Sequence, residues 1–228
     1  MDIEDDNLDR LAKLTEKGSI NIMLDKMERQ QELEYENEAR FNHLHAIGKH
    51  IEDTLREKIG SDLIQVDNPM RTEGNTIVED VQNGQDIVVR IKNGEEWVDI
   101  FYVEVKSKWD FSEPAHMSTR QVRMAALHPN EYALCCVDLR KHKHEDLENL
   151  PTEIILECTN VKMGIGEILN PMLKAILEAD NRSDDEQIKI SEYRSNMGAS
   201  IFEKGDSLDV LLNTIETKIR QKLSSMSS

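Results

Sequence analysis

Apolar and polar positions alternate along two neighbouring stretches of the chain in the way that β-strands require. Residues 86–91 and 97–106 are rich in β-branched and aromatic side chains, which favour strands. Asn93 and Gly94 stand between them, and this pair is typical of a hairpin turn. The two stretches are therefore predicted to pair as antiparallel strands.

The length of the hairpin loop decides which side chains share a face of the predicted sheet. With a three-residue loop, or with one β-bulge, Asp86 lies on the same face as Glu104 and Lys106. With a strict two-residue loop, Asp86 lies on the opposite face. In the first arrangement the other face of the hairpin is apolar and carries Ile87, Val89, Ile91, Phe101, Val103 and Val105.

Two helices are predicted to cover this sheet. The first spans residues 41–59, with Gly60 as its C-cap, and its apolar stripe consists of Ile47, Ile51 and Leu55. Glu52 lies beside that stripe, where its carboxylate either faces the sheet or is that of an ordinary acid on the helix surface. The second helix begins at Ser118, because Ser118 and Gln121 have the spacing of a capping box.

Short apolar runs and helical patterns predict the remaining elements. Strands are expected over residues 63–66, 132–137, 154–156 and 188–193, and helices over 165–177 and 208–223. Pro171 is expected to break or kink the first of these helices. The run over 132–137 is apolar throughout, which is typical of a central strand that is covered on both faces.

The order of these elements predicts three segments along the chain. Residues 1–40 form a helical N-terminal extension, which serves either as a plain extension or as an oligomerisation or docking helix. Residues 41–223 form one compact α/β domain with a central mixed β-sheet flanked by helices. Residues 224–228 form a disordered tail.

Composition narrows the classes of function. The net charge of −17 speaks against stand-alone, non-specific nucleic-acid binding, which normally depends on a basic surface. Clustered acids can nevertheless be metal ligands, and affinity for DNA can come from another subunit. No apolar run approaches 18 residues, so no membrane span is expected.

The cysteines and the N-terminus indicate a cytoplasmic location. The chain begins with an acidic segment, which is unlike the usual secretory signal. Its three cysteines have no metal-ligand spacing, and their odd number argues against a disulfide framework; they are Cys135, Cys136 and Cys158.

Five short motifs follow one another in a recognisable order. They are Gly48-x-x-x-Glu52, Gln85-Asp-Ile87, Tyr102-Val-Glu-Val-Lys-Ser107, Ser118-Thr-Arg-Gln121 and Tyr132-Ala-Leu-Cys-Cys-Val-Asp138. This order resembles the core of the PD-(D/E)xK, or restriction-endonuclease-like, nuclease superfamily. More narrowly, it resembles the nuclease-like domain found at the C-terminus of the plant protein NO VEIN. The resemblance covers about residues 41 to 140 well and the remainder only loosely.

The resemblance implies a metal-dependent deoxyribonuclease that uses Mg²⁺ or Mn²⁺. Asp86 and Glu104 would hold the cation together with the backbone carbonyl of Val105, and Glu52 would complete or support the ligand set. Mg²⁺ prefers oxygen ligands and keeps several waters. Such a cation polarises the scissile phosphate and lowers the pKa of its water.

The resemblance also implies roles for two further side chains. Lys106 would orient the attacking water or offset charge on the phosphorus, and Gln121 would position Lys106 or that water. Gln85 stands where the family has a proline before its aspartate. Asp99 replaces Asp86 as a ligand if the register is reversed, whereas Asp110 lies beyond the strand and is not favoured.

Three functions follow from these observations. The first is an endonuclease that hydrolyses DNA, as the effector domain of a restriction or antiviral defence system beside an ATPase or helicase partner subunit. Double-strand cleavage by such a domain would require a homodimer or sequential nicking. The second is a catalytically inactive module that docks protein partners, with a structural salt bridge between Glu104 and Lys106. The third is a nuclease for RNA or single strands.

Overall fold

The computed structural model describes residue 29 and residues 35–63, 76–79, 85–109, 115–182 and 194–226. The chain divides into two units, residues 1–46 and 47–228. The larger unit thus begins later than the domain boundary predicted at residue 41. The helical patterns of residues 1–28 and the strand predicted over 188–193 lie outside the described residues.

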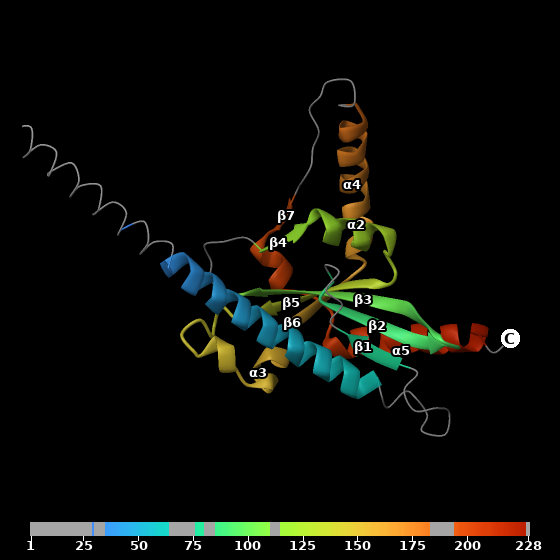
Figure 1. The fold of residues 1–228 in the computed structure, drawn as a ribbon, viewed down its shortest axis with the longest axis horizontal. Coiled ribbons are helices and arrows are strands. Elements are labelled where there is room, and N and C mark those ends of the chain that lie inside the picture. Colours follow the sequence, from blue (N-terminus) through green and yellow to red (C-terminus); the bar gives the residue numbers. More distant parts are fainter. Residues whose placement is uncertain are drawn as a thin grey trace, which may run out of the picture. The chain divides into compact units, whose positions relative to one another are not determined.

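A five-stranded mixed sheet forms the centre of the larger unit (Figure 1), in the order β1-β2-β3-β5-β6. The strands are β1 (Thr76–Glu79), β2 (Ile87–Asn93), β3 (Glu96–Lys108), β5 (Tyr132–Asp138) and β6 (Thr159–Met163). β3 and β5 run parallel, and the other neighbouring strands of this sheet run antiparallel. A second sheet pairs β4 (Ala115–Ser118) with β7 (Arg194–Met197). The predicted α/β class with a central mixed sheet is confirmed.

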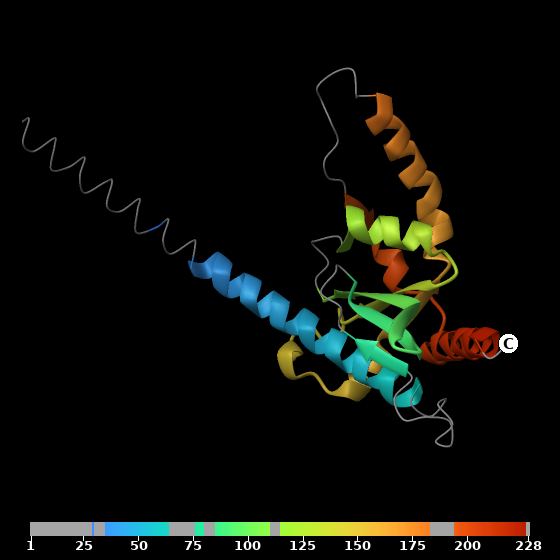
Figure 2. The same ribbon diagram turned by 45° about the vertical axis from the view of Figure 1, so that its right-hand side comes forward.

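Helices cover both faces of the central sheet. They are residues 47–63 of a helix that spans 35–63, α2 (Thr119–Leu127), α3 (Thr152–Glu157), α4 (Ile165–Arg182) and α5 (Leu208–Met226), with short 3₁₀ turns η1 (Leu147–Asn149) and η3 (Ala199–Phe202). Figure 2 shows α2 and α4 together on one side of the sheet. No helix in the described part of the chain is long and apolar enough to cross a membrane.

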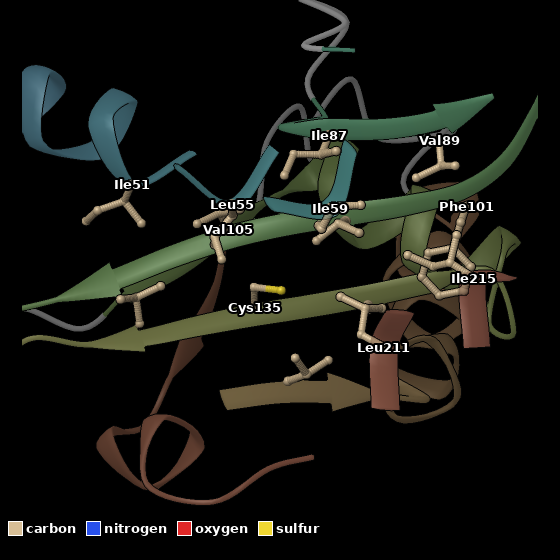
Figure 3. Packing of buried hydrophobic residues seen from close by; sticks show 14 of the residues in the cluster. Ile51, Leu55, Ile59, Ile87, Val89, Phe101, Val105, Cys135, Leu211 and Ile215 are labelled. Atoms are coloured by element: carbon tan, nitrogen blue, oxygen red, sulfur yellow. The ribbon is translucent and has the colours of Figure 1, made fainter. Parts of the chain in front are cut away.

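One apolar core fills each side of the sheet. Figure 3 shows the first core, in which the helix over residues 47–63 and α5 pack against the sheet; its labelled members include Ile51, Leu55, Ile59, Val105, Cys135, Leu211 and Ile215. The second core joins the opposite sheet face to α2 and α4; its members include Val88, Tyr102, Leu134, Val122 and Leu169. The sheet is therefore buried on both faces, which explains why every residue from Tyr132 to Val137 is buried.

The β2–β3 hairpin reaches the predicted face pattern through a bulge. Asn93 lies opposite Glu96, so the loop has two residues rather than three, and Gly94 has the positive φ of 63° that such a turn requires. Further along, Val89 lies opposite Phe101 while Arg90 lies opposite Asp99, which leaves Ile100 as an extra residue on β3. This bulge shifts the parity of the pairing by one residue. The predicted apolar residues of the hairpin consequently all belong to the first core.

The end of the first helix differs from the sequence prediction. Gly60 does not end the first helix, which continues to Leu63. Glycine costs about 1 kcal/mol in a helix interior, but Ile59 and Leu63 are both buried on either side of it, and their burial offsets that cost. The strand predicted over residues 63–66 therefore begins with a helical residue, and 64–66 lie outside the described residues.

The segment predicted as a strand over residues 154–156 is helical, because it belongs to α3. Pro151 precedes this helix, and proline favours helix starts. The strand is β6, in which Thr159 and Val161 are buried while Asn160 is half-buried, the alternation of a strand. The prediction was wrong because three consecutive apolar residues do not distinguish a strand from a short helix.

Two other helices are longer than predicted. Pro171 lies inside α4 without ending it, although proline removes one helical hydrogen bond. α5 reaches Met226, so residues 224–226 are helical where a disordered tail was expected.

Candidate active site

Asp86 and Glu104 meet at the start of β2, on the sheet face that α2 covers. The last pair of the hairpin places Ile87 opposite Val103. Asp86, which immediately precedes β2, therefore lies opposite Glu104. The backbone N–H of Val105 donates a hydrogen bond to Asp86 Oδ2 over 2.6 Å. The geometry that the three-residue loop was expected to provide is thus provided by the bulge at Ile100.

Glu104 is the centre of this cluster. Its side chain is fully buried, and its Oε1 accepts hydrogen bonds from Lys106 Nζ and from Gln121 Nε2. Its other oxygen, Oε2, is buried and has no hydrogen-bond partner among the described residues. The side chain of Lys106 is 20% exposed, so the cluster borders solvent at the lysine.

Burial and neighbouring charges shift the pKa values of Glu104 and Lys106. Burial raises the pKa of Glu104 well above its usual value of 4.5, and Asp86 raises it further, against the opposing effect of Lys106. Burial alone would lower the pKa of Lys106, but Glu104 and Asp86 outweigh it, so that this pKa is raised. The lysine therefore stays charged, and the paired carboxylates favour an additional positive charge beside them.

Glu52 influences this cluster through the charge of Lys106. It raises the pKa of Lys106 less than Glu104 and Asp86 do. In the described part of the chain, no group of three or more His, Cys, Asp or Glu side chains is arranged to hold a metal ion. Asp86, Glu104 and Glu52 therefore do not form a three-carboxylate site in this conformation.

The two central carboxylates nevertheless fit a hard dication. Mg²⁺ is commonly held by one or two carboxylates and keeps several waters. The unpartnered oxygen of Glu104 is a buried acceptor, and a buried acceptor without a donor is unfavourable unless a cation or a donor reaches it. The amide of Val105 contacts Asp86, whereas the proposed role of its carbonyl stays a prediction.

Asp99, the competing acid that the structure describes, has other partners than the cluster. Asp99 accepts hydrogen bonds from Arg90 Nε over 2.7 Å and from the Tyr102 hydroxyl over 3.1 Å. Its carboxylate is thus used at the other end of β3. Asp110 lies outside the described residues.

The side-chain amide of Gln121 makes two hydrogen bonds, one through its oxygen and one through its nitrogen. Its Oε1 accepts the backbone N–H of Ser118 over 2.8 Å, and Ser118 Oγ accepts the backbone N–H of Gln121 over 3.4 Å, so the predicted capping box of α2 is confirmed. Its Nε2 donates to Glu104. The cap therefore fixes the orientation of the amide that contacts the buried carboxylate.

Tyr132 is a polar residue of this face that sequence analysis did not select. Its hydroxyl is buried without a hydrogen-bond partner among the described residues. Burial raises its pKa strongly, and Glu104 and then Asp86 raise it further. The only signal in the sequence is a tyrosine rather than a phenylalanine at the start of an otherwise apolar strand.

Replacing Gln121 with glutamate is expected to lower the free energy of unfolding by about 1–3 kcal/mol. Glutamate preserves the capping box, but it replaces the amide donor with an acceptor facing Glu104. Oε1 of that buried carboxylate then keeps Lys106 as a donor and loses Gln121. Urea denaturation measures the change, and Ser118→Ala, which removes only the cap, should cost about 1 kcal/mol. A Gln121→Glu protein as stable as wild type would contradict the contact with Glu104.

Replacing Glu104 with glutamine is expected to remove part of the pH dependence of stability. Because the pKa of Glu104 is raised above 4.5 in the folded state, the folded protein binds this proton more tightly than the unfolded chain does. Wild-type stability should therefore fall as the pH rises above that value, by at most about 1.4 kcal/mol per pH unit from this group. Glu104→Gln should gain stability relative to wild type as the pH rises above about 5 in EDTA. Equal pH slopes in urea denaturation would argue against the raised pKa.

Comparison of the chain with protein-family models, with curated proteins and with solved structures finds no match.

Proposed function

We propose that this chain is a Mg²⁺- or Mn²⁺-dependent endonuclease of restriction-endonuclease-like fold that hydrolyses DNA phosphodiester bonds. The observation that carries the proposal is the meeting of Asp86 and Glu104 beside Lys106 and Gln121 on one sheet face. The order of elements, with a helix, the β2–β3 hairpin, α2 and the buried β5, supports the resemblance seen in the sequence.

Each side chain has a role that its chemistry allows. Asp86 and Glu104 would hold the dication, which, when bound, polarises the scissile phosphate and lowers the pKa of its water. Lys106 keeps its charge in this acidic setting and would orient the attacking water or offset negative charge on the phosphate. Gln121, fixed by the capping box, would hold the Glu104 carboxylate in place.

The acidic surface bears on how substrate would be bound. A net charge of −17 repels DNA at long range, so affinity is expected to come from a partner. An ATPase or helicase subunit in a restriction or antiviral defence system would supply it. A second copy of the chain would allow both strands to be cut.

Cleavage of supercoiled plasmid DNA tests the proposal. Wild-type protein with Mg²⁺ or Mn²⁺ should produce nicked and then linear plasmid, and EDTA or Glu104→Gln should abolish both products. Glu153→Gln, a change at an exposed acid of α3, is the matched control and should cleave like wild type. If wild-type protein leaves the plasmid intact with either metal even in the presence of its natural partner subunits, the nuclease proposal is wrong.

A second function is favoured by one observation, the ion pair between Lys106 and the fully buried Glu104. In a catalytically inactive interaction module this pair would be structural, and the acidic surface would dock protein partners. Removing one partner of a buried ion pair typically costs about 3–5 kcal/mol. An inactive wild-type protein that loses this much stability in Lys106→Met would support the module.

A further inference from the structure

Two buried oxygens on the α2-covered face of the sheet have no hydrogen-bond partner among the described residues. They are Glu104 Oε2 and the Tyr132 hydroxyl. When Glu104 is ionised, its oxygen is an acceptor, and the tyrosine hydroxyl can donate. An unpartnered buried polar atom is unfavourable, so a phenylalanine would serve better at position 132 if the hydroxyl had no function.

The strand register places both residues on the same face. Tyr132 lies opposite Tyr102, and Leu134 lies opposite Glu104. Residues two apart in a strand share a face, so Tyr132 and Glu104 are diagonal neighbours across β3 and β5. Burial and then Glu104 raise the pKa of Tyr132, which is consistent with this placement.

A donor and an acceptor that share a buried polar region without contacting each other can be joined by a water molecule. Such a water accepts a hydrogen bond from the tyrosine and donates one to the carboxylate. A carboxylate oxygen has two lone pairs, so Oε2 can accept from this water and still ligate a cation.

We propose that Tyr132 is a positioning residue for the cation site: through one buried water, its hydroxyl orients Oε2 of Glu104 toward the dication. This inference rests on the proposed function, because it requires Glu104 to be a ligand. Groups that orient metal ligands commonly change metal affinity by about 10–100-fold when they are removed.

Tyr102 supplies a matched control. It is the neighbour of Tyr132 across β3 and β5 and belongs to the same core. Its hydroxyl, however, donates to Asp99 over 3.1 Å rather than facing an unpartnered carboxylate oxygen. The two tyrosine-to-phenylalanine changes therefore remove the same group from adjacent positions with different surroundings.

Calorimetric titration of the full chain with Mn²⁺ tests the inference, with urea denaturation in EDTA as a check on folding. Tyr132→Phe should bind Mn²⁺ about tenfold more weakly than wild type and remain at least as stable in EDTA. Tyr102→Phe should bind Mn²⁺ like wild type and be less stable in EDTA.

The outcomes separate this inference from the proposed function. If wild type and Tyr132→Phe bind Mn²⁺ equally, the positioning role of Tyr132 is wrong while the metal site stands. If wild type itself binds no Mn²⁺, the metal-dependent function fails, and the role of Tyr132 fails with it.

Discussion

Lys106→Met is expected to lower the rate of Mg²⁺-dependent DNA cleavage by about 10²–10³-fold, the usual effect of removing one group that stabilises a developing negative charge. Methionine retains the unbranched apolar stem of the lysine and removes only its charge. The loss should appear mainly in kcat, because the ammonium would act on charge that develops in the transition state. Single-turnover cleavage of a short labelled duplex measures it.

A control for Lys106→Met must remove a lysine from elsewhere on the same unit. Lys174 is exposed on α4, and Lys174→Met should cleave within a factor of about two of wild type, as is usual for a surface change. Circular dichroism in EDTA verifies that Lys106→Met is folded. A Lys106→Met protein that is folded and cleaves as fast as wild type would exclude a catalytic role for the lysine.

Gly166→Ala is expected to lower the free energy of unfolding by about 2–3 kcal/mol through overpacking. A Cβ at this position would lie 1.9 Å from the carbonyl oxygen of Ala125 and 2.8 Å from Cα of Pro129. Both are backbone atoms, so α4 and α2 would have to move apart. Because α2 carries Gln121, the displacement should also weaken its contact with Glu104 and reduce cleavage. Urea denaturation and the plasmid assay measure the two effects.

Gly48→Ala provides the opposite expectation at another helical glycine. A Cβ on Gly48 meets nothing within 4 Å, so only the helix propensity changes, and the free energy of unfolding should rise by about 1 kcal/mol. A destabilised Gly48→Ala protein beside an unaffected Gly166→Ala protein would contradict the close approach of α2 and α4.

The sequence was sufficient to predict the faces of the sheet, because alternation is a local property. The apolar positions of the hairpin and the stripe of Ile47, Ile51 and Leu55 are all buried. The capping box of α2 was equally accessible, since it depends on two residues three apart. For the site, these local rules sufficed to place Glu104 and Lys106 on one face, whereas the site role of Gln121 was implied only by the resemblance.

The remaining features depend on tertiary contacts that no short window contains. The sequence showed that Asp86 and Glu104 share a face only with a longer hairpin loop or a bulge. It could not show that the bulge lies at Ile100, because either loop length satisfies the local turn chemistry. The helical α3 and the continuation past Gly60 follow from packing against the sheet, which overrides weak local propensities. Tyr132 could not be selected because its significance lies in the missing partner of its hydroxyl.

The most direct test of the site is the binding of Mn²⁺, followed by electron paramagnetic resonance of the free ion. Wild-type protein should bind about one Mn²⁺ per chain, since two carboxylates with retained waters form one such site. Asp86→Asn and Glu104→Gln should each abolish this binding, and Glu153→Gln should leave it unchanged. Mn²⁺ binding that is equal in wild type, Asp86→Asn and Glu104→Gln would show that these carboxylates do not hold the cation.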